Sequence, residues 1–102
     1  MRTIRYSQTF REELRDLLAQ GLPMFGPHVV AEKRRLVLDT VKNFLVHFPI
    51  RTPDPVLGLC ACTVSKTPFV IVYDYDDAEL RVHLIIHSHA DRSQIDLSTV
   101  VW

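Results

Sequence analysis

Five residues in the second half of the chain are of types that support acid–base chemistry: Lys66, His87, His89, Asp91 and Arg92. Histidine is a general acid or base near neutral pH, and lysine or arginine stabilises negative charge that develops in a transition state. A carboxylate such as that of Asp91 can orient an imidazole ring. The alternative interpretation is structural: the histidines lie at the surface of a strand end, and Asp91 and Arg92 form an ion pair.

The cysteines Cys60 and Cys62, taken with His87 and His89, supply the ligand types of a tetrahedral zinc site. If one strand lies between the two pairs, they are separated by about 10 Å, which is too far for a single ion. We therefore expect the cysteines to fill a core as reduced thiols, and we expect no metal or other cofactor.

Alternating apolar residues predict that the candidate catalytic residues are carried by a β-hairpin, from Lys66 to Arg92 with its turn at Asp76-Asp77. A turn centred there gives a register with one apolar face. The core face then pairs Tyr73 with Leu80, Ile71 with Val82 and Phe69 with Leu84. The other face pairs Val72 with Arg81, Val70 with His83, Lys66 with His87 and, beside the turn, Asp74 with Glu79.

The rest of the chain predicts the elements that hold this hairpin. A short strand is expected at Ile4 to Tyr6, and Ser7 is a suitable N-cap for a helix that ends near Gly21. A second helix begins at Pro27 and ends before Pro49. A further strand is expected within residues 56–65.

The predicted order is therefore β-α-α-β-β-β in a single domain, residues 1–102. Two helices with apolar stripes and a sheet with one apolar face bury these surfaces best in two layers. We expect an α+β fold in which a helical hairpin packs on one face of a mainly antiparallel sheet.

Composition narrows the possible partners. The 102 residues carry 12 basic and 12 acidic side chains, and no apolar run is as long as a membrane span. The N-terminus lacks a signal-peptide pattern, so the cytoplasm is the expected location. The only basic run, Lys33-Arg34-Arg35, is typical of a solvated helix face. The alternative for this run is contact with a nucleic acid or an acidic partner.

The string PFVIVYDYDDAELRVHLIIHSHADR, preceded by a short strand and a helical hairpin, resembles the RelE/ParE superfamily of type II toxin–antitoxin toxins, including plasmid stabilisation proteins. The matching features are a Val-Tyr strand end, an acidic turn, a histidine-containing last strand with an Asp-Arg ending, and a glycine before the preceding strand. They fall on Val72, Tyr73, Asp76, Asp77, Leu84, His87, Asp91, Arg92 and Gly58.

The resemblance implies a small cytoplasmic toxin that a cognate antitoxin neutralises in a hetero-oligomer. RelE-like members cleave messenger RNA in the ribosome without a metal, whereas ParE-like members bind DNA gyrase. Three features of the RelE-like nucleases are missing here. Val70 and Ala90 stand where arginines are expected, and residues 59–64 contain nothing basic.

We therefore expect ParE-like growth inhibition by binding to a target such as gyrase. The alternatives are a histidine-based endoribonuclease that uses Lys66, His87, His89, Asp91 and Arg92, and an inactive toxin-like protein. The antitoxin is expected to cover either the exposed face of the sheet or the helical hairpin, with an amphipathic helix or an added strand. The apolar tail, Val100 to Trp102, is expected either to contact a partner or to fold back on the body.

Overall fold

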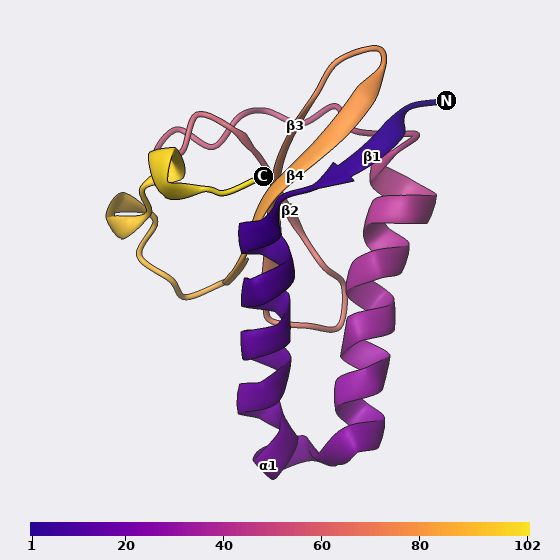
Figure 1. Ribbon diagram of the computed structural model, residues 1–102, viewed down its shortest axis with the longest axis vertical. Helices are drawn as coiled ribbons and strands as arrows, with labels where there is room; N and C mark the ends of the chain where they lie inside the picture. The colour runs from indigo at the N-terminus through magenta and orange to yellow at the C-terminus, as the bar shows by residue number, and fades with distance from the viewer.

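The computed structural model describes residues 1–102 and contains one four-stranded sheet and a long helical hairpin (Figure 1). Its elements are β1 (Thr3–Tyr6), α1 (Gln8–Asp39), η1 (Thr40–Leu45), β2 (Cys60–Thr63), β3 (Phe69–Tyr75), β4 (Glu79–His87), η2 (Arg92–Gln94) and η3 (Leu97–Thr99). The strand order is β1-β4-β3-β2, with β1 parallel to β4 and the other pairs antiparallel. The predicted α+β fold is confirmed.

The helical hairpin consists of two arms that bend at Gly26 and run side by side (Figure 1). We call residues 8–25 the first arm and residues 27–39 the second arm. Gly26 has a φ of +79°, which glycine adopts without the steric cost paid by other residues. The prediction that the first helix ends near Gly21 is wrong, because Gly21 and Pro23 are accommodated within the first arm. None of the helices has the length and apolar character needed to cross a bilayer.

Ser7 joins the start of α1 to the sheet. Its Oγ accepts a hydrogen bond from the backbone N–H of Phe10 at 2.8 Å, so the predicted N-cap is confirmed. The same hydroxyl donates to the carbonyl of His83 in β4 at 2.6 Å. Ser7 is the one polar residue that is fully buried, and both hydrogen-bonding capacities of its hydroxyl are used.

The predicted hairpin is present, but its register is wrong. Tyr75 lies opposite Leu80 and Tyr73 opposite Val82, a shift of two residues at the turn. The turn is wider than two residues because the Asp76 side chain accepts hydrogen bonds from the backbone N–H groups of Ala78 and Glu79. A bulge between the pairs Tyr73–Val82 and Val72–Leu84 adds one residue, His83, to β4. The bulge turns Leu84 to the face away from the helices.

The face of the sheet opposite the helices is apolar and covered, which corrects the expectation of an exposed polar face. Four strand residues on this face, together with Leu57, form a second buried cluster. The C-terminal tail folds back over it through Ile95, Leu97 and Val100. The last residue, Trp102, packs edge-on against His83, with 4.7 Å between ring centroids. The strand residues are Val70, Val72, Leu84 and Ile86.

Arg81 holds the turn of the hairpin together. The predicted pair of like charges, Asp74 opposite Glu79, does not form, because Asp74 lies opposite Arg81. The Arg81 guanidinium lies 3.0 Å from the Asp74 carboxylate, 2.8 Å from that of Asp76 and 3.0 Å from that of Glu79. The hydrogen bond from Arg81, with those from the Glu79 and Ala78 backbone, lowers the pKa of Asp76 to about 2.

We predict that Ser7→Ala lowers the free energy of unfolding by about 1–2 kcal/mol, because it removes a helix cap and leaves the Phe10 N–H and the His83 carbonyl without their partner. Urea denaturation followed by circular dichroism measures the change. Ser65→Ala is the matched control, because Ser65 is exposed and its hydroxyl makes no hydrogen bond to the protein. Equal stability of the two variants would contradict the assigned role of Ser7.

We predict that Arg81→Gln raises the pKa of Asp76 from about 2 toward its ordinary value, without reaching it, because the backbone donors remain. Since the folded-state pKa is the lower one, ionised Asp76 stabilises the fold above about pH 4, and this contribution is lost as the pH falls toward 2. Arg81→Gln should weaken that pH dependence. NMR titration of the carboxyl carbons reports the pKa directly.

The matched control for this titration is Arg35→Gln, which removes an arginine that pairs with two carboxylates elsewhere, Glu32 and Asp39. An Asp76 pKa that moves equally in both variants would show that Arg81 is not its main partner.

Candidate functional site

The two candidate catalytic histidines lie together at the end of β4. His87 is opposite Phe69, whose side chain belongs to the core under the helices, so His87 shares the helix-side face of the sheet. The prediction that it lies on the opposite face is wrong, because the bulge at His83 reverses the alternation beyond it. The ring centroids of His87 and His89 are 5.2 Å apart, and the His89 backbone N–H donates to His87 Nδ1 at 3.2 Å.

Lys66 is not opposite His87, which corrects the predicted cluster. It lies in the turn between β2 and β3 with a φ of +64° and an exposed side chain. Its neighbours include His28 and Glu32 of α1, with which it lines a small cavity. The register shift that pairs His87 with Phe69 leaves Lys66 beyond the last residue pair of the β3–β4 ladder.

Asp91 and Arg92 do not pair with each other. Asp91 caps η2 by accepting hydrogen bonds from the backbone N–H and the hydroxyl of Ser93, and these lower the pKa of its carboxyl. Arg92 forms an ion pair with Asp54, whose side chain is largely buried. Hydrogen bonds from the backbone of residues 56 and 57, and from Arg92, keep the pKa of Asp54 below its usual value despite the opposing effect of burial. Arg92 therefore ties the tail to the segment that precedes β2.

The cysteines Cys60 and Cys62 are free thiols on β2 with side chains buried in the main core. Burial raises the pKa of the Cys60 thiol, which keeps it protonated at neutral pH. No group of three or more histidine, cysteine, aspartate or glutamate side chains is arranged to hold a metal ion.

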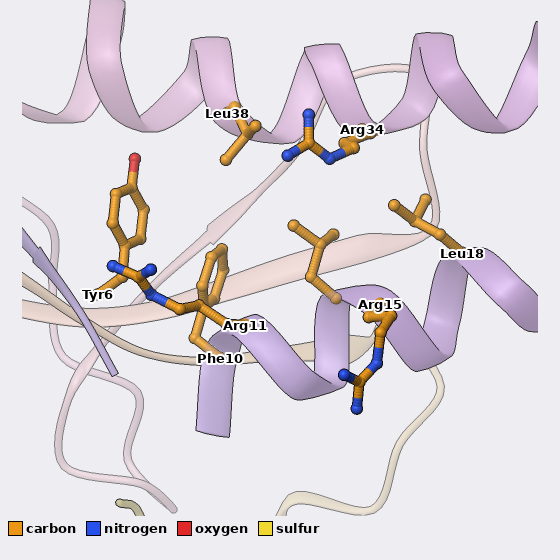
Figure 2. A pocket seen from close by; sticks show the side chains of 8 residues that line it. Tyr6, Phe10, Arg11, Arg15, Leu18, Arg34 and Leu38 are labelled. Atoms are coloured by element: carbon orange, nitrogen blue, oxygen red, sulfur yellow. The ribbon is translucent and has the colours of Figure 1, made fainter. Parts of the chain in front are cut away.

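The largest cavity of the molecule is a groove between the two arms of α1, closed at one end by β1 (Figure 2). We call it the inter-arm groove. It has a volume of about 510 Å³, and its lining combines five apolar or aromatic side chains with three arginines. The lining residues are Tyr6, Phe10, Arg11, Leu14, Arg15, Leu18, Arg34 and Leu38.

Two of the three arginines that line the groove lack a carboxylate partner. Arg11 and Arg34 form no ion pair with any carboxylate, and Arg15 has only an exposed contact of 3.7 Å with Asp16. The groove therefore carries unbalanced positive charge in a chain whose formal net charge is zero. Arg34 belongs to the only basic run in the sequence, Lys33-Arg34-Arg35, and no local pattern links that run to residues of the first arm.

Tyr6 places a phenol at the β1 end of the groove. Its ring stacks on Phe10 with centroids 5.3 Å apart, and the Arg11 guanidinium lies 5.7 Å from the ring centroid. The Tyr6 hydroxyl is buried and has no hydrogen-bond partner. Burial raises the pKa of Tyr6, although the positive charge of Arg11 opposes the shift, so the phenol is neutral and can donate at physiological pH.

Comparison with known proteins supports the fold. No family model and no curated protein sequence matches this chain. Among solved structures, a chain described as "Chromosomal ParDE TA system from P. aeruginosa" is similar, with a TM-score of 0.73 and 16% sequence identity. The similarity covers 85% of this chain and 96% of the other. The β1–α1–β2–β3–β4 arrangement is thus the fold of a chain from a ParDE toxin–antitoxin system, as the resemblance to the RelE/ParE superfamily implied.

Proposed function

We propose that this chain is the toxin component of a type II toxin–antitoxin system, which inhibits growth in the cytoplasm by binding an essential target such as DNA gyrase. A cognate antitoxin would neutralise it in a hetero-oligomer. The observation that carries the proposal is the structural match, over 85% of this chain and 96% of the other, to a chain of the ParDE system. The motif resemblance in residues 58–92 is independent support, because it rests on sequence and not on the arrangement of elements.

The positions of the candidate nuclease residues favour binding over RNA cleavage. Cleavage at a phosphate needs an acid, a base and a cation that converge on one reacting group. In this chain Lys66 is beside α1, Asp91 is engaged by Ser93, and Arg92 is engaged by Asp54. His87 and His89 remain in contact but line none of the five main cavities.

The second candidate function is a ribosome-dependent endoribonuclease whose acid and base are His87 and His89. The observation in its favour is their contact at the exposed end of β4, where Nδ1 of His87 accepts a hydrogen bond and Nε2 is left for another partner. A toxin-like protein without activity is the third possibility, and expression of the chain alone separates it from the other two.

We expect expression of this chain alone to stop growth, and we expect the purified protein to inhibit DNA supercoiling by gyrase without cleaving messenger RNA on ribosomes. The reason is that binding to a target needs an intact surface and no convergent catalytic groups. A supercoiling assay and primer extension on ribosome-bound messenger RNA measure the two activities. Normal supercoiling together with products ending in 2′,3′-cyclic phosphate would replace the proposal by the nuclease.

We expect His87→Ala/His89→Ala to inhibit growth as strongly as the unaltered chain, because neither imidazole is required for a binding mechanism. The matched control is His28→Ala/His47→Ala, which removes two exposed histidines elsewhere. Colony counts after induction measure toxicity, and circular dichroism verifies folding. Loss of toxicity in the first variant alone, with folding retained, would assign the histidines a catalytic role.

A further inference from the structure

We propose that an exposed row of aromatic rings and arginines at the end of the helical hairpin binds single-stranded DNA. Bases would stack on the rings and on the guanidinium planes, and phosphates would lie beside the arginines. The site goes beyond the proposed function, and only the choice of DNA over RNA rests on it. We call this surface the arginine–aromatic row, and its members are Arg2, Phe44, Phe48, Arg51 and Tyr75.

The fold brings the segments of the row together, because η1 ends beside the start of β1 (Figure 1). The Arg2 guanidinium donates to the carbonyl of Val46 at 3.3 Å and to the carbonyl of Asp76 at 2.7 Å. It thereby joins the end of the hairpin to the β3–β4 turn. The buried Tyr73 hydroxyl donates to the Pro49 carbonyl at 2.7 Å and holds the segment after η1 against the sheet. These contacts make the row a preformed surface.

Rings and cations alternate along the row. The rings of Phe44 and Phe48 have centroids 5.8 Å apart, and the Arg51 guanidinium lies 5.2 Å from the Phe44 centroid. Arg51 and Arg2 line one cavity of about 190 Å³, and the Arg2 guanidinium lies 5.3 Å from the Tyr75 centroid. A single nucleic-acid strand presents a similar alternation of flat bases and charged phosphates. Proteins bind such strands with aromatic platforms and cationic side chains.

Phe48 provides the accessible stacking face of the row. It is 63% exposed, and the neighbouring Phe44 is 42% exposed. The His47 ring lies edge-on to the Phe48 ring, with 6.3 Å between centroids and an interplanar angle of 62°. Every base has a π-face, so a ring held open to solvent in this way can stack with a base of any sequence.

The arginines of the row carry charge that no carboxylate balances. Neither Arg2 nor Arg51 forms an ion pair, and their hydrogen bonds go to backbone carbonyls. The three carboxylates that Arg81 holds at the nearby turn are already neutralised. Asp77 is the one acidic residue of this turn without an ion pair. A chain with zero formal net charge therefore has a local excess of positive charge here, which attracts phosphates.

A single strand of DNA fits the row better than a protein or an RNA. Protein interfaces place an apolar centre inside a polar rim, whereas in the row the guanidinium groups lie between the rings. RNA is distinguished from DNA by contacts to the 2′-hydroxyl, and the row has no carboxylate or amide side chain to accept a hydrogen bond from it. A target such as gyrase works on DNA, so DNA is the strand that the chain would meet there.

Fluorescence anisotropy of a labelled 12-nucleotide oligodeoxyuridylate, titrated with the purified full-length chain, measures this binding. We expect Phe48→Ala to raise the Kd at least about fivefold, because it removes one stacked base. Phe48→Leu should lose as much affinity, because it keeps an apolar side chain without a π-face, whereas Phe48→Tyr should retain it. The matched control is Met24→Ala, which removes a side chain of a residue that is 77% exposed at the far end of the hairpin. Its Kd should equal that of the unaltered chain.

The charge of the row is measured by the salt dependence of the same titration. Arg51→Gln should raise the Kd and lower the slope of log Kd against log salt concentration by about 0.7, the value for one phosphate contact on a single strand. Arg34→Gln is the matched control, because it removes an arginine outside the row that also lacks a carboxylate partner. Its slope should not change. Thermal unfolding of each variant verifies that it is folded.

Four results would overturn the inference. The first is anisotropy that stays flat up to about 100 µM of the unaltered chain, the weak limit of non-specific binding. The second is an equal Kd for Phe48→Ala and Met24→Ala, and the third is full affinity of Phe48→Leu, since an apolar contact would then suffice. The fourth is tighter binding of the same strand after pairing with oligodeoxyadenylate, because a duplex hides its bases. Tighter binding of oligouridylate, which differs from the probe by its 2′-hydroxyls, would reject the choice of DNA.

Failure of the row and failure of the proposed function give different results. If the unaltered chain stops growth and inhibits supercoiling but does not bind the probe, only the row is wrong. If the chain binds the probe through Phe48 and Arg51 but does not affect growth, the row is supported and toxicity is rejected.

Discussion

The arrangement of helix and sheet depends on the two hydrogen bonds that the Ser7 hydroxyl makes. It caps the first turn of α1 and donates to the carbonyl of His83, the residue that the bulge adds to β4. Next to it, the Ser7 backbone N–H donates to the carbonyl of Val82. Because Ser7 is fully buried, water cannot replace the hydrogen bonds that it makes to α1 and to β4. These hydrogen bonds therefore fix the direction in which α1 leaves the sheet. That direction positions both walls of the inter-arm groove.

The bulge has a second consequence on the opposite face of the sheet. By reversing the alternation of β4, it turns Leu84 and Ile86 away from the helices, so the sheet has apolar side chains on both faces. Such a sheet needs cover on both sides, and the tail supplies it. The carbonyl of Val101 accepts hydrogen bonds from Gln8 and Thr9, which returns the end of the chain to the N-terminus of α1. The tail is therefore part of the fold and not a free arm.

The sequence predicted the elements well because each has a local signal: Ser7 before an apolar helical stripe, Gly26-Pro27 between the arms, and alternation along the strands. It failed for the pairing register, which the Asp76 turn shifts by two residues and the bulge at His83 shifts by one more. The pattern of β4 fits a regular strand, and the bulge coincides with a tertiary contact, the hydrogen bond from Ser7 to the His83 carbonyl, that the local pattern does not show. The predicted cluster of Lys66 and His87 relied on that register and failed with it. The groove was missed because its arginines come from both arms of α1: Arg11 and Arg15 lie on the first arm, and Arg34 lies on the second.

The distribution of paired and unpaired charge favours the proposed binding mechanism over the alternative nuclease. Most charged side chains near the hairpin already have partners: Arg81 holds three carboxylates, Arg92 holds Asp54, and His83 lies 2.8 Å from Asp74. These pairs fix the turn and the tail, and the guanidinium groups of Arg81 and Arg92, which carboxylates already neutralise, are poorly suited to offset charge on a substrate. Unpaired guanidinium groups beside a preformed apolar surface occur instead between the arms of α1. An apolar surface with unpaired guanidinium groups is stabilised when a partner with complementary shape and charge covers it. A protein that acts by binding needs a surface of this kind.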